Sequence, residues 1–415
     1  MFDRDFWQEV WHTLMQNKLR TFLTAFGVLW GIIMLIILLG AGQGLQNGVQ
    51  SSFGGMATNS IYMWGRSTSK PYAGLPPGRN VRMTVEDGEA MVQQVPNIEV
   101  MAPRAQLGGY RGGNNVSRGN RTAAFDVMGD YPQYKKIQPM NIPEGRYINE
   151  LDIEDKRKVA VIGARARQVL FEPGEDPIGQ SIRINGVYFM VVGVFTTDRT
   201  GNDAERDEQS IYIPFTTFQT AFNYGNQVGW FAFTAKENVS AEEVEESALE
   251  VMRSRHKIAP DDLRAMGHFN AKKEFDRMNN LFAAIQLLIW IVGTGTLAAG
   301  VIGISNILLI VIRERTTEIG IRRALGATPT NIVVQVIVEA LVLTVLAGYT
   351  GLCIGVGVVE LLGVGIQSEM FRNPEINFRI AITALFILGL GGIAAGLIPA
   401  NRAVKIRPVE ALRGM

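Results

Sequence analysis

The sequence predicts a membrane protein with a four-span α-helical transmembrane domain and an α+β domain held outside the membrane on a helical stalk. Two observations lead to this fold class. Only 19% of the 415 residues are charged and 47% are hydrophobic, whereas roughly 25% of residues are charged in an average soluble protein. The charged residues are also missing in four long blocks, while a region of about 240 residues between the first two blocks has ordinary polarity.

The four charge-poor blocks are long enough to cross the hydrocarbon core of a bilayer, which needs about 20 apolar residues. They are Thr21–Gly65, apolar in its first part, Leu281–Ile312, Ile332–Val359 and Ile380–Ala400. A soluble helix rarely stays apolar on every face for this length, so four spans explain the blocks better than four buried helices of a soluble enzyme. The second block would form a helix of about 48 Å, and part of it must therefore stand outside the lipid.

Basic residues beside the spans predict the orientation of the chain. They are Lys18 and Arg20 before the first span, Arg313, Arg315, Arg322 and Arg323 between the second and third, and Arg402, Lys405, Arg407 and Arg413 after the fourth. All three segments fall on one side of a four-span chain. We therefore expect both termini in the cytoplasm; a cleaved signal peptide is the alternative for the N-terminus.

The residues before the first span have the pattern of an amphipathic helix. Its apolar face consists of Phe6, Trp7, Val10, Trp11 and Leu14. A helix that lies in the interface of the inner leaflet explains this pattern. The same face could also bind a cytoplasmic partner.

Helical periodicity continues after the first span and begins again before the second. The first stripe is Leu45, Val49 and Phe53, and the second is Phe275, Met278, Phe282 and Ile285. The steps of three and four residues are typical of paired helices. We expect the two helices to leave the membrane and pair as a stalk, although extension of each helix by a turn or two would give the same pattern.

The region between the stalk segments has the signals of an α+β domain. Short strands are expected at Ile61–Trp64, Ile98–Met101, Lys158–Ile162 and Ile211–Pro214, and a hairpin at Ile182–Phe195. The Asn185-Gly186 pair predicts the turn of this hairpin. Capping-box spacing predicts two helices, one starting after Thr84 with Asp87 and one after Ser240 with Glu243.

We expect the α+β domain to have two parts. The Gly-rich basic segment Arg111–Arg121 is the place where one part leaves and the other begins. We expect its arginines to solvate a hairpin. A contact surface for an anionic ligand or a partner is the alternative.

The sequence lacks the motifs of common catalytic sites. It has no GxSxG, HExxH or CxxC, a single cysteine (Cys353) and three scattered histidines (His12, His256 and His268), so we expect no catalytic residue and no metal site. The phosphate-binding motif GxxxxGK[ST] is also absent, and ATP would have to be bound by another polypeptide. The 40 basic and 39 acidic residues nearly balance, which argues against a nucleic-acid partner.

The spans contain four GxxxG pairs, which allow helix backbones to approach closely in lipid. The pairs are Gly27 with Gly31, Gly40 with Gly44, Gly351 with Gly355 and Gly392 with Gly396. We expect them to mediate helix packing within the chain or across a dimer. Glu339 is the only charged residue of the third block, and we expect it to snorkel or to pair with a basic loop residue.

The segment Arg313–Ile332 predicts a short amphipathic helix on the membrane face. Six charged residues alternate there with Ile319, Ile321, Ala324 and Leu325. Gly326 ends the helix as a C-cap glycine does, and Thr328-Pro329 starts the next one. A cytoplasmic partner could grip this helix and move it.

The chain resembles the MacB/FtsX-type permeases of ABC transporters over essentially its whole length. The motifs that carry the resemblance are NKLRTFLTAFGVLWGI (17–32), VAVIG (159–163), DPIGQSIRINGVYFMVVGV (176–194), EIGIRRALGA (318–327) and PANRAVKIRPVEALR (399–413). The resemblance implies an inner-membrane protein without a fused ATPase. Its extracytoplasmic domain would have a porter-like part and an inserted Sabre-like part.

The resemblance and the spans together divide the chain. We expect an interfacial helix (1–20), a first span (21–42), a stalk helix (43–57), the extracytoplasmic domain (58–270, with the inserted part at about 111–207), a stalk helix and second span (271–312), a coupling helix (313–330), a third span (331–360), a short loop (361–379), a fourth span (380–400) and a cytoplasmic tail (401–415).

The resemblance also implies a mechanism called mechanotransmission. A separate cytoplasmic ATPase, which binds ATP and Mg²⁺, would bring together the stalks of two identical or paralogous permease subunits and so drive their outer domains. The match to EIGIRRALGA implies that the ATPase-coupling residues are Arg313, Glu314, Arg315, Glu318, Ile319, Gly320, Arg322, Arg323, Ala324, Leu325, Gly326 and Ala327.

We therefore expect a permease subunit that exports a drug, toxin, peptide or similar substrate, together with a periplasmic adaptor and an outer-membrane channel. Lipoprotein extraction or control of a cell-wall hydrolase is the alternative within the same family. A membrane-anchored receptor would share the spans and the outside domain, but it would have no use for the coupling helix.

Overall fold

The computed structural model describes residues 7–8, 11, 15, 18–53, 55–109, 113–199, 201–366, 371–374 and 378–406. The chain divides into two compact units. Unit 1 comprises Met1–Val49 and Asn280–Met415, and unit 2 comprises Gln50–Asn279. Most of the helix expected over residues 1–20, together with Arg407 and Arg413 of the expected tail, lies outside the described residues.

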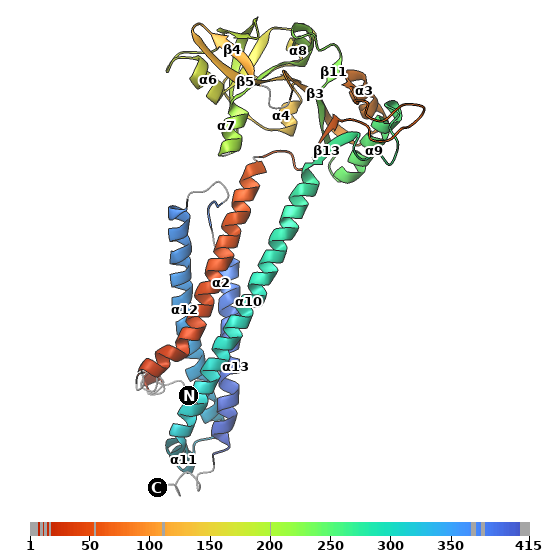
Figure 1. Ribbon diagram of the computed structural model, residues 1–415. Helices are drawn as coiled ribbons and strands as arrows, with labels where there is room; N and C mark the ends of the chain where they lie inside the picture. The colour runs from red at the N-terminus through yellow and green to blue at the C-terminus, as the bar shows by residue number, and fades with distance from the viewer. Residues whose placement is uncertain are drawn as a thin grey trace. The chain divides into compact units, whose positions relative to one another are not determined.

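Unit 1 is built from the long helices that carry the four charge-poor blocks (Figure 1). They are α2 (Lys18–Phe53), α10 (Ala271–Glu314), α12 (Pro329–Gly365) and α13 (Phe378–Val404), with the short α11 (Thr316–Ala324) between α10 and α12. α10 begins in unit 2 and continues into unit 1. Among the residues that the structure describes, these four helices are long and apolar enough to cross a membrane, as the sequence predicts.

The helix α2 extends beyond its apolar part, as the stalk pattern predicts. Within unit 1, the side-chain amide of Gln286 on α10 donates to that of Gln46 on α2 over 3.5 Å. The backbone N–H of Arg372 donates to the carbonyl oxygen of Gly44 over 3.0 Å, and the ring of Phe371 covers the same glycine. Residues 371–374 therefore pack against α2 at this level.

The glycines of the four GxxxG pairs face neighbouring segments of the same unit. A Cβ atom on Gly27 would lie 3.5 Å from the Cα of Gly300 in α10, and one on Gly351 would lie 2.8 Å from the carbonyl oxygen of Leu29 in α2. The nearest neighbours of the others are Leu297 for Gly31, Val359 for Gly40, Phe371 for Gly44, Ile36 for Gly355, Thr344 for Gly392 and Ile337 for Gly396. All eight therefore lie at contacts within one subunit, and a role for them in a dimer stays a prediction.

Unit 2 is organised around a sheet with two halves. One half contains β1 (Ser60–Gly65), β3 (Ile98–Gln106), β12 (Trp230–Ala235) and β13 (Met266–Asn270). The other contains β4 (Asn114–Arg118), β5 (Arg121–Asp130), β6 (Asn141–Gly145), β7 (Val159–Gly163), β8 (Ser181–Ile184), β9 (Val187–Thr196) and β10 (Ser210–Pro214). β3 joins the halves, because it pairs with β12 along most of its length and with β5 through Ala105 and Gln106.

Helices pack on both halves, which gives the predicted α+β class. The first half carries α3 (Val85–Gln94) and α9 (Ala241–Arg255). A separate two-stranded sheet pairs β2 (Met83–Thr84), which precedes the second half in the sequence, with β11 (Gln227–Val228), which follows it. The second half contains α5 (Glu150–Glu154), α6 (Ala164–Leu170), α7 (Asn202–Glu208) and α8 (Phe215–Ala221). The short helix α4 (Tyr134–Ile137) follows β5 in the sequence but packs on β3 and β12 of the first half. The inserted part expected to end near residue 207 stays a prediction, while β10, which follows that position, pairs with β5 and β7.

The local signals for strands, turn and helices are confirmed. The β8–β9 hairpin turns at Asn185 and Gly186, which both adopt the positive φ that such a turn requires. Thr84 and Asp87 form the predicted capping box at α3. Ser240 is the N-cap of α9, but its side chain makes no capping hydrogen bond, so the position of the helix start was right and the expected bond was wrong.

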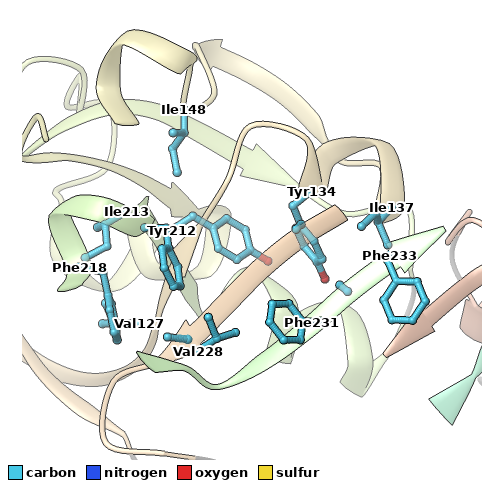
Figure 2. Packing of buried hydrophobic residues seen from close by; sticks show 14 of the residues in the cluster. Val127, Tyr134, Ile137, Ile148, Tyr212, Ile213, Phe218, Val228, Phe231 and Phe233 are labelled. Atoms are coloured by element: carbon cyan, nitrogen blue, oxygen red, sulfur yellow. The ribbon is translucent and has the colours of Figure 1, made fainter. Parts of the chain in front are cut away.

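A single hydrophobic core runs through both halves of unit 2. Figure 2 shows side chains of the two halves together: Phe231 and Phe233 come from β12, while Tyr134, Tyr212 and Val127 come from α4, β10 and β5. Because these side chains pack into one cluster, the two halves share their apolar burial. The second half is therefore not a separate domain on a linker.

A buried ion pair lies at the junction of the two halves. Nη2 of Arg104, on β3, lies 2.8 Å from Oδ2 of Asp130 at the end of β5. The Arg104 guanidinium carbon lies 3.5 Å from the ring centre of Tyr134, and the rings of Tyr212 and Trp230 lie 5.7 and 5.3 Å away. Arg104 is 6% exposed and Asp130 is fully buried. This aromatic-lined pair ties β3 to β5, and the sequence analysis did not predict it.

The arginines of the Gly-rich segment have acidic partners where the structure describes them. Arg118 pairs with Glu175, and Arg121 pairs with Glu172 over 2.9 Å and donates to the carbonyl oxygen of Phe171. These pairs fasten the β4–β5 hairpin to the loop after α6. Arg111 lies outside the described residues.

Candidate coupling site at helix α11

The helix α11 is bounded by the signals that the sequence analysis identified. It runs from Thr316 to Ala324, and Gly326 follows with a φ of 103°, the left-handed conformation that ends helices with glycine. Thr328 is the N-cap of α12, with Pro329 in its first turn, where the missing proline N–H costs nothing. The chain therefore makes a tight reversal between the two helices.

The inward face of α11 packs on the ends of three long helices. Gly320 is buried, and Ile319 packs against a small apolar cluster, whose buried members are Ile312 of α10, Ile332 and Val336 of α12, and Ala400 and Ala403 of α13. The predicted coupling helix is thus in contact with the ends of α10, α12 and α13. Apolar burial of this kind stabilises the contact without fixing its direction.

A chain of polar contacts fixes α11 to α12. Arg315 donates through Nε and Nη2 to both carboxylate oxygens of Glu318, over 2.8 and 3.0 Å, and its Nη1 lies 3.3 Å from Oε1 of Glu339 on α12. Arg322 donates to Glu318 over 2.6 Å and to Oε1 of Gln335 over 3.2 Å. Gln335 and Glu339 are one turn apart on α12, so the chain of contacts starts and ends on the same helix. Of the two expectations for Glu339, the structure shows pairing with a basic residue between the spans, which is Arg315.

The charges of α11 stabilise each other. The hydrogen bonds from Arg315 are the main reason why the pKa of Glu318 lies below its usual value. Glu318 in turn raises the pKa of Arg315, with Glu339 as the second acidic neighbour. Arg315 and Glu318 are therefore charged at neutral pH, and charge-assisted hydrogen bonds of this kind are stronger than neutral ones.

A further contact links α11 to the end of α13. Nη1 of Arg323 donates to the carbonyl oxygen of Val404 over 2.7 Å and also to that of Ile406. These carbonyls belong to the last residue of α13 and to the second residue after it, where no intrahelical donor is available. Arg323 therefore acts as a side-chain cap for α13.

The other predicted coupling residues lie at the end of α10, on α11 and directly after it, and most of them are exposed. Arg313, Glu314, Ile321, Ala324, Leu325 and Gly326 are exposed, and Ala327 is half-buried. Leu325 is 83% exposed and Ile321 is 40% exposed. The twelve predicted residues thus separate into a set that anchors α11 to the long helices and a set that is exposed.

Among the described residues, no group of three or more His, Cys, Asp or Glu side chains is placed to hold a metal ion. A small cavity of about 30 Å³ lies among α10, α11 and α12. Its polar lining consists of Arg315, Glu318, Arg322, Gln335 and Glu339, and the rest of its lining is apolar. This volume is of the order of a single water molecule. This cavity is therefore too small for a ligand much larger than water.

Family models match both units of the chain. Residues 21–251 match the model of the MacB-like periplasmic core domain. The chain belongs to this family. Residues 290–408 of this MacB-type permease match a second model, the FtsX-like permease C-terminal domain, and this match includes α11 and the ends of α12 and α13 that hold it.

Curated relatives of this MacB-type permease are export proteins. The macrolide export ATP-binding/permease protein MacB of Bdellovibrio bacteriovorus is 27% identical over 90% of this chain and 56% of its own length. The pyoverdine export ATP-binding/permease protein PvdT of Pseudomonas putida is 28% identical over 89% of this chain and 54% of its own length. The chain therefore spans just over half the length of these relatives. The crystal structure of the periplasmic region of MacB from Actinobacillus actinomycetemcomitans is 18% identical, with a TM-score of 0.44, and covers 55% of this chain and 96% of that one.

The sequence analysis named the α11 residues that contact α12 but did not name Gln335, one of their partners on α12. The residue type of Gln335 gives no signal by itself, because a glutamine near a helix start is common. Its spacing of four residues from Glu339, on the face that would meet a returning basic helix, is the signal that could have identified it.

Proposed function

We propose that this chain is the permease subunit of an ABC-type exporter and that it passes ATP-driven motion from a cytoplasmic ATPase to unit 2. The observation that carries the proposal is the division of α11 into two faces. One face is fixed to α10, α12 and α13 by Ile319, Arg315, Arg322 and Arg323. The other exposes Leu325 and Ile321, an apolar pair flanked by charges that suits a pocket on a protein partner.

The similarity to the macrolide and pyoverdine export proteins supports export as the direction of transport. Both relatives are named ATP-binding/permease proteins, and no GxxxxGK[ST] motif occurs in these 415 residues. We therefore assign the binding of ATP and Mg²⁺ to an ATPase polypeptide outside them. The ends of α10, α12 and α13 near α11 would then face the cytoplasm, in agreement with the basic residues there.

The working unit would be a pair of permease subunits with two ATPase subunits. Closure of the paired stalks would drive unit 2 while the substrate stays outside the spans. A periplasmic adaptor and an outer-membrane channel would complete the export path in a cell with two membranes.

Replacing Leu325 by aspartate is expected to abolish association with the ATPase. Leu325 is 83% exposed, so the change removes little packing within the permease, whereas a charge in an apolar contact costs several kcal/mol of binding. The measurement is co-purification of tagged full-length permease with the ABC ATPase subunits of its own genome, co-expressed one at a time, together with ATP hydrolysis in membranes.

Leu263→Asp is the matched control, because Leu263 is 78% exposed in unit 2. This variant should co-purify with the ATPase as the unchanged chain does. Undiminished ATPase binding by the Leu325→Asp permease would show that α11 is not the coupling element.

A further inference from the structure

Glu339 is a buried carboxylate and the only charged residue within the long stretch Ile332–Val359 of α12. It is 4% exposed and lies within α12, a candidate span. An ionisable side chain in such a position lowers stability unless it is paired and hydrogen-bonded. One of its partners is Arg315, whose Nη1 lies 3.3 Å from Oε1 of Glu339. An apolar residue at this position would pack α12 equally well. The charge of Glu339 therefore points to a role other than packing.

Arg315 lies at the junction of two helices and reaches a third. It follows the last residue of α10 and is the N-cap of α11, and its guanidinium bonds Glu318 on α11 and Glu339 on α12. The planar fork of an arginine can hold two carboxylates in one fixed geometry. The contact between Arg315 and Glu339 therefore holds the junction of α10 and α11 against α12.

A second bridge makes the attachment rigid against rotation. Arg322 bonds Gln335, one turn before Glu339 on α12, while it also bonds Glu318. One bridge would allow α11 to pivot about it. Two bridges to the same helix fix both the position and the rotation of α11, which the apolar contact of Ile319 cannot do, because apolar contacts are not directional.

We propose that Glu339 is the positioning residue through which movement of α11 is passed to α12. The proposal rests on the function proposed above and adds the route that the movement takes within the permease. Glu339 makes no contact with the ATPase, since it is buried, and Leu325 and Ile321 on the outward face supply that contact. Loss of the Glu339 charge should therefore leave ATPase binding intact and separate α12 from the movement of α11.

The first experiment uses full-length permease in lipid nanodiscs without ATPase. Glu339→Gln keeps the size of the side chain and removes its charge. Backbone amides of residues 319–325 are expected to exchange hydrogen roughly tenfold faster or more in this variant, because α11 opens more often when one bridge is weakened. Glu360→Gln, an exposed position on the same helix, is the matched control and should leave the exchange of α11 unchanged.

The second experiment uses the complex with the ATPase that the Leu325 test identifies. Hydrogen exchange is compared between the nucleotide-free complex and the complex trapped with ATP and vanadate. The unchanged permease should show an ATP-dependent difference at the start of α12, residues 329–345, and at the end of α10. In Glu339→Gln the difference in α12 should fall at least several-fold, while the difference in α10 and the amount of co-purified ATPase are retained.

Arg315→Lys provides a second variant in case Glu339→Gln folds poorly. It keeps the positive charge but lacks the planar fork that bonds both carboxylate oxygens of Glu318 and reaches Glu339, and the same loss in α12 is expected. An α12 response to ATP that is equal in both variants and in the unchanged permease would overturn the proposal, as would unchanged exchange of α11 in the first experiment. Absence of any ATPase partner for the unchanged permease would instead refute the proposed function, and the first experiment would still decide whether Glu339 anchors α11.

Discussion

Replacing Asp130 by alanine is expected to lower the free energy of unfolding of unit 2 by about 3–5 kcal/mol, the cost of leaving one member of a buried ion pair alone. Arg104 would keep its charge among Tyr134, Tyr212 and Trp230 with no carboxylate to balance it. Since β3 and β5 join the two halves of the sheet here, the damage should reach both. Hydrogen exchange of full-length protein in detergent should speed up roughly a hundredfold in β3 and β5.

Two further variants test the physical reason for this effect. Asp155→Ala breaks the pair of Asp155 with Arg157, in which the Asp155 side chain is 57% exposed, and should change the stability by less than about 1 kcal/mol. The double variant Arg104→Met with Asp130→Leu removes both charges and should be less damaging than Asp130→Ala alone. An Asp130→Ala protein that exchanges as slowly as the Asp155→Ala protein would contradict the assignment of the pair as a tie between the halves.

Replacing Gly351 by valine is expected to separate α2 from α12. The new Cβ would lie 2.8 Å from the carbonyl oxygen of Leu29 and 3.3 Å from the Cβ of Ile32. The Leu29 oxygen belongs to the α2 backbone and cannot move aside as a flexible side chain can, so the helices must shift. Overpacking of this kind costs about 1–3 kcal/mol, and the midpoint of thermal unfolding in detergent should fall by roughly 3–10 °C.

Gly357→Val is the matched control for this experiment, because it makes the same change in the same helix. Outside its own helical turn, no atom of the described residues lies within 4 Å of the position of its Cβ. The midpoint should therefore stay within a degree or two of that of the unchanged protein, on the order of the 0.5 kcal/mol seen for open positions. Equal midpoints for the two valine variants would show that the Gly351 contact does not hold α2 and α12 together.

Local signals predicted the long helices of unit 1 and several strands, a hairpin and two helices of unit 2, but not its remaining elements. The charge-poor blocks predicted the four long helices because the bilayer imposes a length and an apolar composition that few soluble helices meet. Asn185-Gly186 predicted its hairpin because only residues that tolerate positive φ fit a two-residue turn. Gly326 and Pro329 predicted the ends of α11 and α12 for the same kind of local reason.

Long-range pairing was not accessible to the same reasoning. Arg104 and Asp130 lie on different strands, 26 residues apart, and nothing in their immediate neighbours marks either as buried. The four GxxxG pairs predicted close helix packing. They did not show whether the partner helix belongs to the same chain or to a second copy. Steric contact in the structure places each glycine against its own subunit, because helix partners depend on the path of the whole chain.

The sequence by itself determined which segments are apolar enough for a membrane and which are polar enough for water. It also determined that Arg313–Ala327 contains an amphipathic helix. Hydropathy, capping residues and the alternation of charge are local properties of the chain. Only the tertiary structure decided which of those residues anchor α11 and which face outward. Glu339 and Gln335 come to Arg315 and Arg322 because α12 folds back after Gly326. The pairing of charges in a membrane domain depends on that return, since a buried carboxylate is tolerated only where the fold delivers a cation to it.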